Sequence, residues 1–79
     1  MSVKVRFLGI LREFQPEADE NGFWIIPADG RTIQQVIDET GVEQSPWEYV
    51  PTVNGDNQYK NYVLKDGDEL DFITTFIGG

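Results

Sequence analysis

Four pairs of residues that favour tight turns divide the chain, and they restrict its fold more than any other feature of the sequence. The pairs are Asn21-Gly22, Asp29-Gly30, Asn54-Gly55 and Asp66-Gly67. Asparagine and aspartate tolerate positive φ angles and glycine adopts them at no steric cost, so each pair is a strong turn signal. The segments between them suit one short strand or helix each. With 79 residues, the chain has room for a single domain, residues 1–79.

The first segment begins with a strand pattern. Residues 3–7 alternate apolar and charged side chains, which is typical of a strand with one buried face. The three apolar residues of this run are predicted to face the core. Leu8 continues the opposite phase, so it is an apolar residue on the outer face. After Gly9, apolar residues recur at three- and four-residue spacing and indicate a short helical turn, and the acidic stretch 15–21 is interpreted as a loop.

The last segment repeats the strand pattern. In residues 69–77, Leu70 and Phe72 share one face, and Ile73 lies on the other. Residues 23–26 are aromatic and β-branched, which favours a second strand.

The remaining strand signals are weaker. Residues 49–53 are predicted to form a strand, and Pro51 within them argues for an edge position or a strand start. Residues 59–64 have two interpretations, a short strand or an irregular segment.

Residues 31–40 form the clearest predicted helix. Thr32 is a good N-cap, Gln35 lies where a capping box needs it, and Gly41 is a typical C-terminal stop. The apolar stripe of this helix can cover one face of the sheet. The predicted contact between helix and sheet consists of Val5, Phe7, Ile33, Val36, Ile37, Leu70 and Phe72. The expected fold class is α+β, a mixed four- to five-stranded sheet packed on one main helix.

The composition excludes several functions. The chain has no histidine and no cysteine, so nucleophilic triads and zinc sites with nitrogen or sulfur ligands cannot be built, and neither a metal site nor a catalytic site is expected. The net charge of −8 disfavours nucleic acid and anionic membranes as partners. The acidity either keeps the domain soluble or steers a basic protein partner. The absence of cysteine and of long apolar runs predicts a cytoplasmic location.

The chain ends in a glycine pair, Gly78-Gly79. One interpretation is a frayed end without function. The other is a thin, flexible arm that enters a narrow active site on another protein. The reactive group at its tip is the α-carboxylate, which is ionised at neutral pH and is a poor electrophile. A partner enzyme has to activate it, for example as an acyl-adenylate, after which sulfur can replace one oxygen and give a thiocarboxylate.

These features together resemble the MoaD/ThiS family of ubiquitin-like sulfur carriers, and within it most closely the small subunits of molybdopterin synthase. The resemblance covers nearly the whole chain. Residues 3–14 are similar to the first strand and short helix of the family, and the helix capped by Thr32 is similar to its helix. The most specific part is the run 64–70, Leu-Lys-Asp-Gly-Asp-Glu-Leu, followed by the terminal glycine pair.

The resemblance implies a β-grasp (ubiquitin-like) fold and a carrier function without catalysis by the chain itself. It implies that a ubiquitin-activating-type enzyme uses ATP to adenylate Gly79, which is then converted to a thiocarboxylate. In the molybdopterin case, the tail enters the large subunit of molybdopterin synthase and its sulfur goes to a pterin precursor, for molybdenum or tungsten cofactor synthesis. No cofactor bound to the chain is implied. Thr74 and Thr75 stand where molybdopterin carriers often have proline. Thiamine or another sulfur pathway, a protein modifier conjugated through Gly79, and a plain interaction domain are the alternatives.

An apolar patch is predicted beside this arm. The first and last strands of a β-grasp fold are neighbours, so Leu8 and Ile73 are expected to lie close together on the outer face. Phe76, Ile77 and Gly78 extend the patch toward the tip of the chain. Exposed apolar patches on small domains often mark protein contacts, and these residues are therefore predicted to bind the partner.

Overall fold

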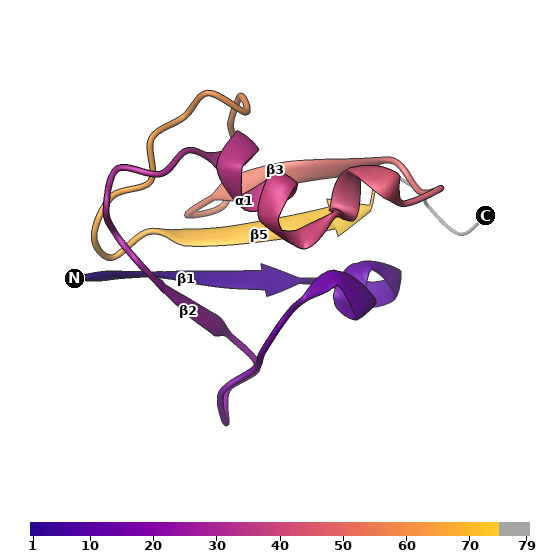
Figure 1. Cartoon of the computed structure of the whole chain (residues 1–79), viewed down its shortest axis with the longest axis horizontal. Helices are drawn as coiled ribbons and strands as arrows, with labels where there is room; N and C mark the ends of the chain where they lie inside the picture. Colours follow the sequence, from indigo (N-terminus) through magenta and orange to yellow (C-terminus); the bar gives the residue numbers. More distant parts are fainter. Residues whose placement is uncertain (75–79) are drawn as a thin grey trace.

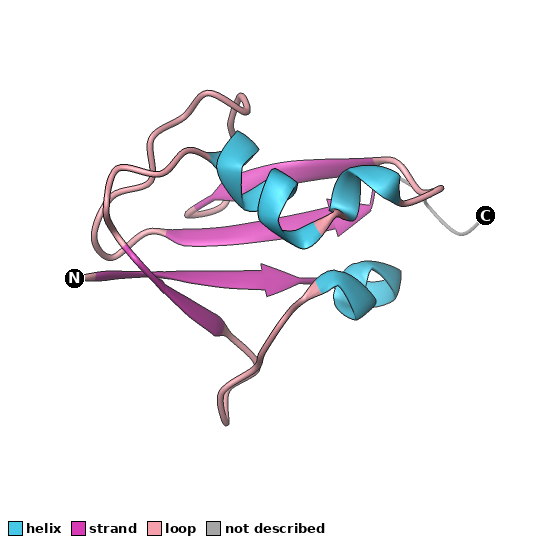
Figure 2. Ribbon diagram, viewed as in Figure 1, coloured by secondary structure: helices cyan, strands magenta, loops and turns pink. Residues whose placement is uncertain are grey.

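The computed structural model describes residues 1–74, which form one sheet and three helical segments (Figure 1 and Figure 2). In chain order the elements are β1 (Ser2–Phe7), a 3-10 helix η1 (Gly9–Phe14), β2 (Trp24–Pro27), α1 (Ile33–Thr40), a second 3-10 helix η2 (Val42–Gln44), β3 (Tyr49–Val53), β4 (Asp56–Asn57) and β5 (Glu69–Thr74). The predicted strands and the helix are confirmed to within two residues, except that positions 75–77 of the last strand lie outside the described residues.

The five strands form a mixed sheet in the order β2-β1-β5-β3-β4. β1 and β5 run parallel, and the other neighbouring pairs are antiparallel. The first and last strands therefore lie side by side at the middle of the sheet, as the sequence predicts. Figure 2 shows α1 crossing one face of this sheet. The arrangement confirms the α+β class and the β-grasp fold.

The core lies between α1 and the sheet. Every second residue of β1 is buried, and β5 repeats the alternation. The rings of Phe7 and Phe72 stack there with their centroids 4.6 Å apart. All seven predicted contact residues are at most 1% exposed. Burial of each such side chain contributes about 1.5–3 kcal/mol, so this contact dominates the stability of a small domain. Further buried apolar residues complete the core: Val3, Leu11, Ile26, Val42, Val53 and Leu64.

α1 begins and ends where the sequence predicts. The Thr32 hydroxyl accepts a hydrogen bond from the Gln35 N–H, and the Gln35 side chain accepts one from the Thr32 N–H. This capping box satisfies a helix N–H that has no partner within the helix. Gly41 ends the helix with φ of 74°, a left-handed conformation that favours glycine.

Residues 59–64 are irregular, and the start of α1 provides the reason. The carbonyl oxygens of Lys60 and Tyr62 accept hydrogen bonds from the N–H groups of Gln34 and Ile33, at 2.8 and 3.1 Å. These donors belong to the first turn of the helix and have no partner inside it. The segment is thereby held against the helix, and the fifth strand is β4, which the sequence did not single out.

Pro51 lies in β3, which is not the edge strand. The short β4 flanks β3 and pairs only with Thr52 and Val53. The Pro51 carbonyl oxygen accepts a hydrogen bond from the Gln58 N–H at 3.2 Å, beyond the end of β4. The N–H and C=O of a strand residue point to the same side, so the donor that proline lacks would also have faced this poorly paired side.

Candidate partner-binding site

The predicted site residues fall into two groups. Leu8 and Ile73 belong to the described part of the chain. The others lie outside the described residues, so their roles stay predictions: Phe76, Ile77, Gly78 and Gly79.

A row of three apolar residues, Leu8, Ile73 and Val50, crosses three strands on the face of the sheet opposite α1, and we call this row the outer strip. Leu8 keeps an extended backbone, with φ of −96° and ψ of 149°, so its side chain points away from the side on which Phe7 is buried. Its N–H donates to the Phe72 carbonyl at 3.0 Å, which continues the β1–β5 ladder and places Leu8 opposite Ile73. Ile73 is paired with Val50 on its other side.

The structure therefore brings together the two described residues that the sequence predicts as contacts. All three residues of the outer strip are half-buried, which leaves part of each side chain open to a partner. Side chains of neighbouring strands on one face of a sheet contact each other, since their Cβ atoms lie about 4.5–5.5 Å apart. The three residues can therefore form one continuous apolar surface.

Val50 is the residue of the outer strip that the sequence did not predict. Its phase was visible, because Val50 and Thr52 alternate with the other residues of β3. The sequence does not say which phase faces outward, because Pro51 and the neighbouring valines allow either choice. The pairing of Val50 with Ile73 settles it.

A charged row lies beside the outer strip, two residues earlier along β1. Arg6 pairs with Asp71 across the β1–β5 ladder, and its Nη2 atom lies 3.4 Å from Asp71 Oδ2 and 3.6 Å from Glu69 Oε2. The guanidinium also lies 4.9 Å from the centroid of the Phe23 ring. The Asp71 side chain is only 15% exposed, so salt screens this group less than a fully exposed one. The row is polar, and it borders the outer strip on one side.

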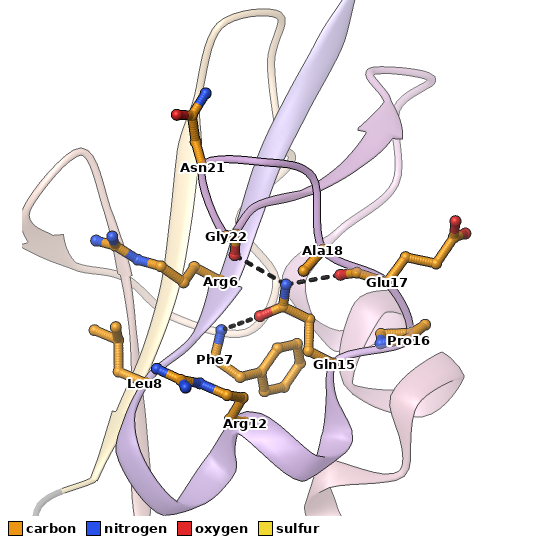
Figure 3. A pocket seen from close by; sticks show the side chains of 10 residues that line it. All are labelled: Arg6, Phe7, Leu8, Arg12, Gln15, Pro16, Glu17, Ala18, Asn21 and Gly22. Carbon is orange, nitrogen blue, oxygen red and sulfur yellow. Dashed lines mark hydrogen bonds between the residues drawn. The ribbon is translucent and has the colours of Figure 1, made fainter.

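A cleft of about 520 Å³ adjoins the outer strip, between the end of β1, η1 and the loop after it (Figure 3). The Gln15 side chain fixes its wall. Its Oε1 atom accepts a hydrogen bond from the Phe7 N–H at 3.0 Å, and its Nε2 donates to the carbonyl oxygens of Glu17 and Gly22 at 2.7 and 3.0 Å. One side chain thus ties the acidic loop to β1, and Leu8 belongs to both the cleft and the outer strip.

At the opposite end of the sheet, Asp68 fixes the turn that leads into β5. Burial raises the pKa of its carboxyl, but hydrogen bonds from the Lys65 N–H, the Tyr62 hydroxyl and the Asn54 amide outweigh this effect and hold the pKa below its ordinary value. The hydrogen bond to Asp68 raises the pKa of Tyr62 in turn. These contacts position β5, and through it Ile73.

The described residues offer surfaces for binding. An apolar strip, a paired charged row and a walled cleft meet at one end of the sheet. Within residues 1–74, no three acidic side chains are grouped so that they could hold a metal ion. In the same part of the chain, no helix is long and apolar enough to cross a membrane.

Comparisons with known proteins identify a family and a fold. A family model described as the ThiS family matches residues 5–79. The structure of SAMP1 from Haloferax volcanii is similar, with a TM-score of 0.70 and 15% identity over 100% of both chains. A chain in the protein–protein complex of subunits 1 and 2 of the molybdopterin-converting factor from Helicobacter pylori 26695 is also similar, with a TM-score of 0.64 and 23% identity over 100% of both chains. At these identities the likeness concerns the fold alone. No curated protein matches the chain.

Proposed function

The chain belongs to the ThiS family, and on this premise we propose that it is a sulfur carrier whose C-terminal Gly79 bears the sulfur. It is a small ubiquitin-like protein of the ThiS/MoaD type. In the proposed role it has no catalytic site of its own and acts as the small subunit or co-substrate of a sulfurtransferase.

The proposed chemistry takes place at the terminal carboxylate. On an adenylating enzyme, an oxygen of the Gly79 carboxylate attacks the α-phosphorus of ATP, pyrophosphate leaves, and an acyl-adenylate forms. Hydrosulfide, HS−, then attacks the acyl carbon, AMP leaves with its bond to that carbon broken, and the thioacid loses its proton to give a thiocarboxylate. ATP is a substrate of the activating enzyme and not a cofactor of this chain. Activation is needed because a carboxylate with a pKa of about 3.3–3.7 is fully ionised at neutral pH.

The single observation that carries the proposal is the short distance in sequence between the outer strip and the terminal glycine pair. The described part of β5 reaches Thr74, one residue after Ile73 of the outer strip, and the sequence has Gly78-Gly79 four and five residues after Thr74. Fully extended, five residues span roughly 17 Å. That length suffices for the tip to enter a partner's active site while the outer strip rests on the partner's surface.

We propose that the adenylating enzyme and the sulfur acceptor both bind this end of the sheet. The outer strip would supply the apolar centre of the contact, together with Phe76, Ile77 and Gly78. The net charge of −8 favours a basic partner surface and a rapid, salt-sensitive association.

The pathway we propose is molybdopterin biosynthesis, in which the tail enters the large subunit of molybdopterin synthase and gives its sulfur to a pterin precursor there. The full-length likeness to a chain of the molybdopterin-converting factor complex supports this choice. The run 64–70 and the terminal glycines resemble the MoaD/ThiS family as a whole, so they support the carrier function and not one pathway. The alternatives are another sulfur pathway, such as that of thiamine, or a protein modifier conjugated through Gly79.

Intact-mass analysis of the protein purified from its own cells tests the proposal. A sulfur carrier is expected to show a fraction in which one oxygen is replaced by sulfur, and the fragment spectrum should place the change at Gly79. A protein modifier would instead be recovered in covalent conjugates through the same residue. If neither species is found in cells that are making molybdopterin, the proposal is wrong.

A further inference from the structure

Arg12 is the one cationic side chain without a partner in residues 1–74. The chain has six basic residues against 14 acidic ones. Arg6 and Arg31 form ion pairs with carboxylates, and each of the three lysines lies over an aromatic ring or beside one. Arg12 is exposed and has neither kind of contact within the described residues. In so acidic a chain, an arginine left unpaired is unexpected.

Arg12 lies at the cleft beside the outer strip. Arg12 lines the cleft together with Arg6, so two of the three arginines of the chain meet at one feature. Figure 3 shows the side chains of Arg6, Leu8 and Arg12 extending to the same side of the cleft. The carboxylate of Glu17 lies on the far side of the loop, away from the Arg12 guanidinium.

The backbone that carries Arg12 is held in place. Arg12 lies in the last turn of η1, and its carbonyl oxygen accepts a hydrogen bond from the Gln15 N–H at 3.0 Å. The preceding residue, Leu11, is fully buried and fixes η1 to the core. Gln15 also ties the following loop to β1. The base of the arginine is therefore preorganised, which reduces the entropy lost when the guanidinium binds a ligand.

We propose that Arg12, with Arg6 beside it, seats a carboxylate side chain of the adenylating enzyme that docks on the outer strip. A guanidinium presents paired N–H donors that match the two oxygens of a carboxylate. Leu8 is shared by the cleft and the strip, so an acidic residue at the margin of an apolar contact would reach Arg12. The inference rests on the proposed function, and the adenylating enzyme is the chosen partner because sulfur transfer and protein conjugation both begin with adenylation.

The contact at Arg12 would determine how the chain is oriented on the enzyme more than how strongly the two proteins attract each other. The overall charge of the chain attracts basic surfaces, and an acidic residue of the partner is repelled almost everywhere on the domain. Among residues 1–74, Arg12 is the cation that has neither an ion pair nor an aromatic ring beside it. In other orientations, the acidic residue of the partner would face carboxylates of the chain and be repelled. Binding at Arg12 therefore favours the orientation in which the C-terminus points at the nucleotide site of the enzyme.

The test is ATP–pyrophosphate exchange by the adenylating enzyme with the full chain as substrate. Arg12→Gln is expected to raise the KM for the chain about tenfold with kcat unchanged, the effect of losing one charge-assisted hydrogen bond. Arg12→Lys should fall between Arg12→Gln and the native chain, because an ammonium keeps the charge and loses the paired geometry. Lys65→Gln is the matched control, since it removes the same charge near Asp68 at the other end of the sheet, and its KM should equal the native value.

A charge exchange identifies the partner residue. Arg12→Glu should nearly abolish exchange, and an acid-to-lysine change at the contacting position of the enzyme should restore it. If the native chain is active and Arg12→Gln keeps the native KM, the seat is refuted and the carrier function stands. If the native chain itself supports no exchange, the proposed function fails and the seat fails with it. Thermal melts of every variant must match the native protein, and a KM change that follows a lower melting temperature would count against the seat.

Discussion

Replacing Leu70 with alanine is expected to remove a large share of the stability of the domain. Leu70 is fully buried in β5, the central strand, with Val5 of β1 on one side and Val53 of β3 on the other. Truncating a buried leucine costs about 2–5 kcal/mol, because transfer energy is lost and a cavity remains. We expect a value in the upper half of this range, since buried strands on both sides prevent the site from collapsing.

The size of the domain makes this loss easy to measure. A chain of 79 residues has a free energy of unfolding of about 4–12 kcal/mol, at roughly 0.05–0.15 kcal/mol per residue. In a domain of this length each lost kcal/mol lowers the melting temperature by about 4–8 °C, so Leu70→Ala should lower it by at least about 14 °C.

Ile73→Ala is the matched control, because Ile73 lies in the same strand but faces the outer strip and is half-buried. Its loss should be about 1 kcal/mol or less. Urea and thermal unfolding followed by circular dichroism measure both variants. Equal losses for the two, or no loss for Leu70→Ala, would refute the assignment of the two faces of β5.

The remaining predictions concern the outer strip and the turn before β5. Aspartate in the outer strip should weaken binding of the adenylating enzyme several-fold and leave folding cooperative, because a charge at an apolar contact centre must be desolvated. The variants are Leu8→Asp, Val50→Asp and Ile73→Asp, and unchanged affinity in all three would show that the strip does not take part in binding. The pKa of Asp68 is lower in the folded chain than its ordinary value of 3.8, so the unfolded chain takes up the proton first and stability should fall as the pH drops below about 4. Asp68→Asn should flatten this acid slope in urea titrations, and an unchanged slope would contradict the role given to the turn.

Features encoded within one segment could be predicted from the sequence. The alternation of apolar residues in β1 and β5 identified their buried faces, and Thr32, Gln35 and Gly41 marked both ends of α1. Each of these signals depends on residues a few positions apart. The outward phase of Leu8 and Ile73 followed from the same alternation, which is why the pair was found without a structure.

Features that depend on contacts between segments could not be predicted. Val50 joins the outer strip only through the register of β3 against β5, and Pro51 obscures that register in the sequence. The cleft exists because the Gln15 side chain bonds to three backbone groups, a contact that no local pattern indicates. Residues 59–64 do not form a strand of the sheet, because their carbonyl groups bond to the N-terminus of α1. The weak strand pattern in the sequence could not reveal that partner.

Deletion of Gly79 tests the central claim most directly. The measurement is ATP–pyrophosphate exchange by the adenylating enzyme, with the shortened and the native chain compared at equal concentration. We expect native melting behaviour and no detectable exchange for the shortened chain, because its carboxylate would stop one residue short of the nucleotide site. Exchange at the native rate would show that activation does not require Gly79, and the carrier mechanism proposed for that residue would be wrong.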